Sequence, residues 1–188
     1  MVRLFVSVEV PASVKQRLEW IGCDLPGARW VEPDQMHLTV RFIGEVDELV
    51  FDDVQAALEG VRAPAFDLTL EGVGHFPPRG EARVLWVGIE KSEPLVQLHD
   101  RIERALARAG VEPEKRRFSP HVTLARLQQS PGRAVGSFLA THGLLRFDPF
   151  RVGEFHLYSS ALSAKRAVHR CEASYPLLEE PVPLATGP

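Results

Sequence analysis

The sequence predicts an α+β protein with two lobes related by a pseudo-twofold axis, in which two antiparallel-type sheets with outer helices surround a central groove. Three observations favour this fold. Short stretches of alternating apolar residues predict strands, and longer stretches with helical spacing separate them. The order strand, helix, strand that begins at Arg3 returns at Arg83. The motif HLTVRF at His37 also returns, as HVTLAR at His121, which indicates an internal duplication.

The first half of the chain begins with a strand over residues 3–10, where every second residue is apolar. After Pro11 the apolar spacing becomes three to four residues and predicts a helix that ends near Gly22. A loop rich in proline and glycine leads to the strand over 37–43. An amphipathic helix over 47–61 and short strands around a glycine over 66–76 complete this half.

The second half repeats this order with a strand over 83–90 and a helix over 92–110. Ser92 is the expected N-cap of that helix, Pro94 lies in its first turn and Gly110 ends it. The strand over 121–126, a weaker helix over 132–143 and strands over 150–160 follow. Matching histidines are 84 residues apart, as are the strands that begin at Phe66 and Phe150.

We therefore predict one bilobal domain over residues 1–178, with repeat units of about 3–76 and 83–160 and one extra strand near 168–177. Alternating strands and helices are also compatible with a doubly wound parallel sheet. We prefer antiparallel sheets because no glycine-rich phosphate loop follows any strand and because the repeat divides the chain into halves. Residues 179–188 contain three prolines and predict an extended tail.

Composition limits the classes of function. The 188 residues carry 22 basic and 25 acidic side chains, a net charge of -3, so a nucleic-acid site must be local. The two cysteines, Cys23 and Cys171, form no disulfide framework and no metal-binding pattern. The apolar N-terminus fits a strand better than a signal peptide, and no apolar run reaches the length of a membrane span. We expect a soluble, cytoplasmic, monomeric protein with no membrane partner.

The two repeated motifs place polar side chains together. In a strand, His37 and Thr39 point to one face while the residues between and after them point to the apolar side. The same alternation pairs His121 with Thr123. Chance predicts only about 0.2 His-x-Thr triplets for this composition, and the chain contains two with matching apolar neighbours. The remaining histidines are assigned ordinary structural roles: His75, His99, His142, His156 and His169.

Two facing imidazoles suit acid–base catalysis, since one can accept a proton while the other donates one near neutral pH. Threonine hydroxyls beside them can donate hydrogen bonds to the oxygens of an anion, and a phosphodiester fits best. Neither motif has an Asp, Glu or Cys at ligand spacing, so we predict no metal and no other cofactor. A serine hydrolase is disfavoured because the chain has no GxSxG sequence.

The segments HLTVRFIGEV, FSPHVTLAR, RLFVSVEVP and FHLYSS resemble the 2H phosphoesterase superfamily, and most closely its RNA 2′,3′-cyclic phosphodiesterase group, historically called 2′-5′ RNA ligases. The resemblance covers about residues 3–177. It implies a bilobal α+β fold in which each lobe contributes one His-x-Thr strand. It also implies metal-independent opening of a 2′,3′-cyclic phosphate, on an RNA end or a small cyclic nucleotide, to a 2′-phosphate.

The resemblance implies a role for each residue of the two motifs. His37 would be the general acid that protonates the departing 3′ oxygen, and His121 the general base that activates water. Thr39 and Thr123 would hold the non-bridging phosphate oxygens. Because the two halves are pseudo-symmetric, the sequence does not decide which histidine is the acid and which is the base.

Phe42 and Arg126 each stand five residues after a motif histidine, and the resemblance implies that they hold the terminal base. Simple alternation contradicts this, because an odd offset places both on the opposite face and makes Phe42 a core residue. A bulge near Gly44 would turn Phe42 back. Alternation places Arg41 on the His37 face, where it would add positive potential or remain solvated.

Two other functions use the same residues. One is RNA end joining, the reverse reaction, in which a 5′-hydroxyl replaces water. The other is a nucleotide-binding or RNA-binding module without turnover. The intact histidine pair argues against the binding module, since loss of one histidine is the expected mark of an inactive relative.

Overall fold

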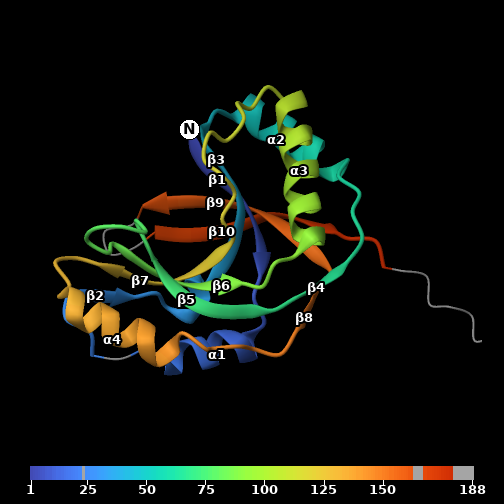
Figure 1. The fold of residues 1–188 in the computed structure, drawn as a ribbon. Helices are drawn as coiled ribbons and strands as arrows, with labels where there is room; N and C mark the ends of the chain where they lie inside the picture. Colours follow the sequence, from blue (N-terminus) through green and yellow to red (C-terminus); the bar gives the residue numbers. More distant parts are fainter. Residues whose placement is uncertain (23, 163–166, 180–188) are drawn as a thin grey trace, which may run out of the picture.

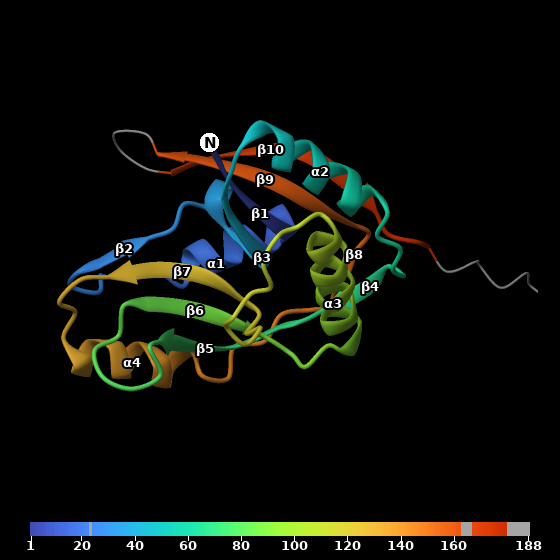
Figure 2. The same ribbon diagram turned by 90° about the horizontal axis from the view of Figure 1, so that it is seen from above.

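A long antiparallel sheet runs through the molecule, with α2 and α3 beside one part of it and α1 and α4 beside another (Figures 1 and 2). Buried residues of all four helices belong to one core cluster. The computed structural model describes residues 1–22, 24–162 and 167–179. Its strands lie in the order β10-β9-β1-β3-β7-β6-β5, and β2 also pairs with β7. A separate ladder joins β4 to β8.

The elements have the following bounds. The helices are α1 (Ala12–Trp20), the short 3-10 helix η1 (Pro33–Gln35), α2 (Glu48–Glu59), α3 (Glu93–Arg108) and α4 (Gly132–His142). The strands are β1 (Val2–Glu9), β2 (Ala28–Trp30), β3 (His37–Val46), β4 (Phe66–Leu68), β5 (Leu70–Phe76), β6 (Val84–Ile89), β7 (His121–Leu127), β8 (Phe150–Val152), β9 (Glu154–Leu162) and β10 (Ala167–Pro176).

The α+β class and the antiparallel pairing are confirmed, and the doubly wound parallel alternative is wrong. Every ladder between named strands in the described ranges is antiparallel. The strand groups β10-β9-β1-β3 and β7-β6-β5 meet through one register pair, Leu38 opposite Val122. The two expected sheets are therefore two parts of one continuous sheet.

The two halves of the sequence interlock rather than each forming its own sheet. β5 comes from the first half but pairs with β6 of the second, whereas β9 from the second half pairs with β1 of the first. The β4–β8 ladder also joins the halves. Each half thus covers a strand edge that the other half would otherwise leave unpaired, which protects both edges from pairing with another chain.

The N-cap and the terminal glycine predicted for α3 are confirmed, and α2 has an N-cap that was not predicted. The Asp47 side chain accepts a hydrogen bond from the Val50 amide at 2.9 Å at the start of α2, and Ser92 accepts one from Leu95 at 3.3 Å at the start of α3. Gly110 follows α3 with a φ of 80°, a conformation that glycine adopts without a steric penalty. These caps fix where α2 and α3 begin and where α3 ends.

Strand β2 and helix η1 were not predicted, because the proline and glycine residues around them indicate only a loop. Gly27 precedes β2 with a φ of 77°, and a Cβ atom there would lie 2.2 Å from the Gln128 carbonyl oxygen. Glycine therefore allows the start of β2 to approach the end of β7 closely. This contact adds a short strand beside β7, on the edge that β3 leaves unpaired.

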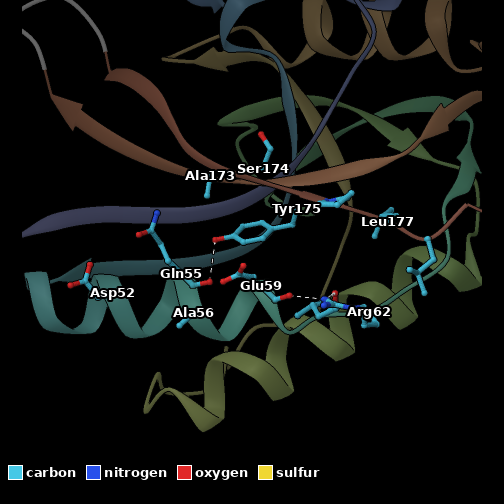
Figure 3. A pocket seen from close by; sticks show the side chains of 12 residues that line it. Asp52, Gln55, Ala56, Glu59, Arg62, Ala173, Ser174, Tyr175 and Leu177 are labelled. Atoms are coloured by element: carbon cyan, nitrogen blue, oxygen red, sulfur yellow. Dashed lines mark hydrogen bonds between the residues drawn. The ribbon is translucent and has the colours of Figure 1, made fainter.

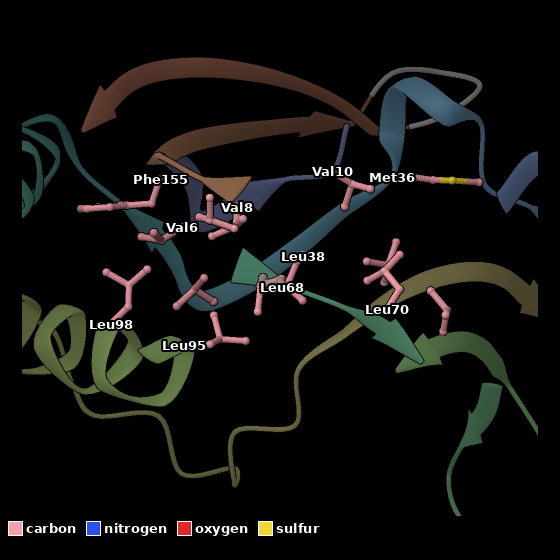
Figure 4. Packing of buried hydrophobic residues seen from close by; sticks show 14 of the residues in the cluster. Val6, Val8, Val10, Met36, Leu38, Leu68, Leu70, Leu95, Leu98 and Phe155 are labelled. Carbon is pink, nitrogen blue, oxygen red and sulfur yellow. The ribbon is translucent and has the colours of Figure 1, made fainter. Parts of the chain in front are cut away.

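The apolar core lies on one face of the strands that carry the histidine motifs. Figure 4 shows Val6 and Val8 of β1 and Leu38 of β3 in the same cluster as Leu95 and Leu98 of α3. All of these side chains are almost completely buried. Burial of one face fixes the register of the strands, since a slip of one residue would move the apolar side chains into solvent.

Other expectations from the sequence concern membrane spans, cysteines and the tail. None of the helices in the described ranges is long and apolar enough to cross a membrane. Cys171 is a free, exposed thiol. Cys23 and most of the expected tail, residues 180–188, lie outside the described residues.

Candidate active site

A β-bulge interrupts the first histidine motif. Thr39 lies opposite Ser7 in the β1–β3 ladder and Arg41 lies opposite Val6, so Val40 is an extra residue without a partner. Val40 and Arg41 are consecutive and both buried, which alternation does not allow in a regular strand. The bulge therefore shifts every later residue of β3 by one position.

The second motif carries the same irregularity at the same distance from its histidine. In the β6–β7 ladder, Trp86 lies opposite Thr123 and Leu85 lies opposite Ala125, so Leu124 is the extra residue. Leu124 and Ala125 are both 0% exposed, and Arg126 after them is exposed. The two motifs thus share a bulge at the same position as well as the His-x-Thr residues.

The bulges decide where Phe42 and Arg126 lie. Phe42 is 58% exposed and its ring centroid lies 6.1 Å from that of Phe5, which also stacks on His37. The prediction from alternation, that Phe42 is a core residue, is wrong because the bulge at Val40 restores Phe42 to the His37 face. The β1–β3 ladder contains two irregularities. The bulge at Val40 lies before Phe42, and a second irregularity near Gly44 leaves Ile43 without a partner in the ladder.

The same bulge overturns the expectation for Arg41. Arg41 is only 5% exposed and faces the buried side of β3, not the face of His37. Its guanidinium forms an ion pair with Glu103 of α3 and donates to the backbone carbonyls of Phe42 and Glu112. A buried guanidinium needs such partners to offset the cost of losing water. Arg41 therefore stabilises the bulged strand from its buried face.

The two His-x-Thr motifs meet on neighbouring strands. Leu38 of β3 lies opposite Val122 of β7 in an antiparallel pair, and this is the register pair that joins the two strands. The motif residues that flank this pair, His37 and Thr39 on one strand and His121 and Thr123 on the other, therefore lie where the strands touch.

On each strand the histidine and the threonine of the motif are both partly buried, and the residue between them is buried. Each imidazole therefore shares its face with a hydroxyl of its own strand, and the other motif lies across the Leu38–Val122 pair. All four of these side chains are partly buried.

His121 is held by the backbone just before it. Its Nδ1 lies 2.7 Å from the Ser119 carbonyl oxygen, and a carbonyl can only accept, so Nδ1 carries the hydrogen. In the neutral ring Nε2 is then free to accept a proton. Burial lowers the pKa of His121, and the hydrogen bond to Ser119 opposes this only in part. Phe76 contacts the ring edge-on, with centroids 4.9 Å apart.

His37 has a matching environment. Burial, and to a smaller extent the nearby His169, lower its pKa to about 4, although a hydrogen bond to the Gln35 backbone opposes the change. A bond that favours the charged imidazole is one that the ring donates, so Gln35 plays the part of Ser119, two residues before the histidine. The Phe5 ring stacks on His37 at 4.9 Å with an interplanar angle of 25°.

The sequence did not point to His169, which was placed among the structural histidines. Its ring lies on β10 with its centroid 5.1 Å from that of His37 and 5.0 Å from that of Phe5. β10 follows the duplicated units, so no repeated motif marks this residue. His169 makes the surroundings of His37 differ from those of His121, which faces Phe76 and Trp86.

A carboxylate also lies on the His37 side of the cluster. Glu9 is the β1 partner of His37 in the ladder, and it accepts a hydrogen bond from the Tyr158 hydroxyl. Lys15 forms a 3.0 Å ion pair with it. Burial acts to raise the pKa of Glu9, but the bonds from Tyr158 and Lys15 prevail and lower it. Glu9 is therefore ionised near neutral pH.

A cavity lies elsewhere, between α2 and β10 (Figure 3). Its volume is about 770 Å³, and Asp52, Glu59 and Tyr175 are among its lining residues. The Tyr175 hydroxyl donates to the Gln55 carbonyl at 3.4 Å. None of the motif residues lines this cavity, so the candidate site rests on the side-chain cluster of β3 and β7.

The cluster has no obvious set of metal ligands. Within residues 1–22, 24–162 and 167–179, no three His, Cys, Asp or Glu side chains gather in an arrangement that could hold a metal ion. Two imidazoles, two hydroxyls and nearby aromatic rings remain, and these groups can bind an anion and transfer protons.

The chain is similar in sequence to known proteins. Residues 10–163 match the family model described as the 2′-5′ RNA ligase superfamily. A protein of Archaeoglobus fulgidus named RNA 2′,3′-cyclic phosphodiesterase is 30% identical over 171 residues, which are 89% of this chain and 96% of that protein. A Thermotoga maritima protein of the same name is 31% identical over 176 residues, with 89% and 91% of the two chains covered.

Solved structures show the same fold. The crystal structure of the Thermus thermophilus protein TT0787 has a TM-score of 0.79 and 26% identity, and the match covers 93% of this chain and 97% of that one. E. coli LigT complexed with 3′-AMP has a TM-score of 0.75 and 28% identity, with 94% and 98% covered. The resemblance inferred from the motifs is thus confirmed at the level of sequence and of fold.

Proposed function

Because this chain belongs to the 2′-5′ RNA ligase superfamily, we propose that it hydrolyses 2′,3′-cyclic phosphates at RNA ends and leaves a 2′-phosphate. The observation that carries the proposal is the cluster of two imidazoles and two hydroxyls across the Leu38–Val122 pair. The names of the relatives describe a cyclic phosphodiesterase, and the cluster has the groups that such a reaction needs.

His121 is the general base of the proposed reaction. With Nδ1 bonded to Ser119, the free Nε2 removes a proton from water as the water oxygen attacks phosphorus. A depressed pKa keeps this imidazole neutral, and therefore able to accept a proton, at pH 7. The P–O3′ bond breaks while the P–O2′ bond remains, so the product is a 2′-phosphate.

His37 is the general acid that donates a proton to the departing 3′ oxygen. With a pKa of about 4 this ring is neutral in the free protein, so it must take up a proton when substrate binds. The negative charge of the phosphodiester favours that uptake, and the ionised Glu9 acts in the same direction. Substrate binding and protonation of His37 are therefore coupled.

Thr39 and Thr123 bind the non-bridging oxygens of the phosphate. Each lies two residues after a histidine and shares its face, and the Leu38–Val122 pair brings the two strands together. Hydroxyl bonds to a charged oxygen are stronger than neutral ones and gain further in a partly desolvated site. Phe42 and Arg126 extend this face and contact the terminal base, as both bulges turn them toward the cluster.

The test is product analysis of an RNA oligonucleotide that ends in a 2′,3′-cyclic phosphate, incubated with EDTA. A 2′-phosphate supports the proposal, and a 3′-phosphate contradicts the leaving group assigned here. Loss of activity with EDTA would show that a metal takes part. Binding without turnover would favour a binding module, and a joined product in the presence of a 5′-hydroxyl RNA would show the ligation reaction.

The acid and base can be separated with a substrate in which sulfur replaces the bridging 3′ oxygen. A thiolate leaves without protonation, so this substrate should restore activity to His37→Ala but not to His121→Ala. The opposite pattern would exchange the two roles. Equal behaviour of the variants would contradict an acid–base pair with distinct roles.

A further inference from the structure

Arg29 and Arg126 lie directly opposite each other in the β2–β7 ladder. Both side chains are exposed, and partners in this position project from the same face of a sheet. Like charges placed opposite each other repel and destabilise the strand pair. In the described part of the chain, neither guanidinium forms an ion pair with an acidic side chain.

This arginine pair lies on the face that carries the histidine cluster. The bulge at Leu124 returns Arg126 to the face of Thr123, and Arg29 joins it there as its cross-strand partner. Trp30, the next residue of β2, points to the other face and packs on Phe138 of α4 at 5.6 Å. The anion-binding face of β7 therefore continues from Thr123 into two guanidinium groups.

The distance along β7 suits an extended ligand. Two residues separate Thr123 from Arg126, and one of them is the bulge residue Leu124, so the partner strand advances only from Trp86 to Val84, about 7 Å at the usual rise. An RNA whose terminal phosphate lies between the histidines can reach this region with its next phosphate. The chain has a net charge of -3, so two unpaired arginines here form a local feature, not part of a generally basic surface.

We propose that Arg29, together with Arg126, forms a subsite for the RNA backbone phosphate next to the terminal nucleotide. The inference rests on the proposed function and adds a preference for oligonucleotides over mononucleotides. A guanidinium binds a phosphate through two parallel hydrogen bonds, and the bound charge offsets the repulsion between the arginines. Arg126 serves the terminal base as well, whereas Arg29 contacts only the backbone.

The experiment compares kcat/KM for a 2′,3′-cyclic mononucleotide with that for an RNA pentamer ending in a 2′,3′-cyclic phosphate. Arg29→Gln should lower the pentamer value about 10-fold and leave the mononucleotide value within twofold. Arg126→Gln should lower both values. Arg101→Gln is the matched control, because Arg101 is an exposed arginine on α3, and α3 packs against the buried side of the sheet. This control variant should change neither the mononucleotide value nor the pentamer value.

A binding measurement keeps the inference separate from turnover. The probe is a fluorescein-labelled pentamer ending in a 2′-phosphate, titrated at several salt concentrations. Arg29→Gln should weaken binding and reduce the salt slope by about 0.7, the value for one lost phosphate contact on a single strand. An unchanged slope, or equal losses for mononucleotide and pentamer, would overturn the subsite. If the unaltered protein opens neither substrate, the proposed function fails while this binding result still decides the role of Arg29.

Discussion

The depressed pKa of His37 predicts a specific loss of stability in acid. The folded protein holds this imidazole neutral down to a pKa of about 4, whereas in the unfolded chain it titrates near 6.5. As the pH falls below 6.5 the unfolded state binds a proton first, so the free energy of unfolding decreases until the pH reaches about 4. The stabilisation that comes from the depressed pKa of His37 is complete above pH 6.5 and is lost as the pH falls from 6.5 to about 4.

The size of the effect follows from the two pKa values. The full difference corresponds to about 3 kcal/mol, and about 2.5 kcal/mol of it should be lost between pH 7.5 and pH 4.5. His37→Asn removes the titrating group while it keeps a polar side chain on the strand. The variant should therefore lose about 2.5 kcal/mol less than the unaltered protein over this interval.

Urea unfolding at the two pH values measures the effect, with His37→Asn and the unaltered protein compared at each. Taking the difference between proteins removes the contributions of titrating groups that lie far from His37. NMR titration of the His37 ring gives the pKa directly. Equal losses in the two proteins, or a ring that titrates near 6.5, would refute the claim that burial keeps His37 neutral.

Three further outcomes are expected. Thr39→Val and Thr123→Val each keep the shape of the side chain but remove a hydrogen bond from the hydroxyl to a charged phosphate oxygen. Each should lower kcat/KM about 10-fold to 100-fold. A change below twofold would exclude contact between that hydroxyl and the phosphate. Phe42→Ala should raise KM for an RNA end several-fold with little effect on kcat, and an unchanged KM would remove Phe42 from the base site. Activity after dialysis against EDTA should equal the original activity, and recovery only after adding a divalent cation would contradict metal-independent hydrolysis.

The duplication made much of this fold predictable. Strands and helices in equivalent places supported one another, so even the glycine-containing helix α4, Gly132–His142, was expected, over residues 132–143. The exchange of β5 and β9 between the halves was not predictable, because strand patterns show which residues alternate but not which strand a free edge will accept. Strand β2 was hidden among turn-forming residues and is visible only through its ladder with β7.

The candidate site shows where simple alternation fails. It paired each histidine with its threonine correctly, since no irregularity comes between them, but it placed Arg41 and Phe42 on exchanged faces. The sequence carries no direct mark of the bulge at Val40, whose position depends on the ladder with β1. His169 was missed for a different reason, because its place beside His37 depends on tertiary packing alone.

The central claim is that His37 and His121 act as one acid–base pair, and single-turnover hydrolysis of a cyclic-phosphate RNA tests it most directly. His37→Asn and His121→Asn should each slow the chemical step about 100-fold or more in proteins that remain folded. Because neither group works without the other, the double variant should be little slower than the slower single variant. A near-normal rate in either single variant would contradict the two-histidine mechanism.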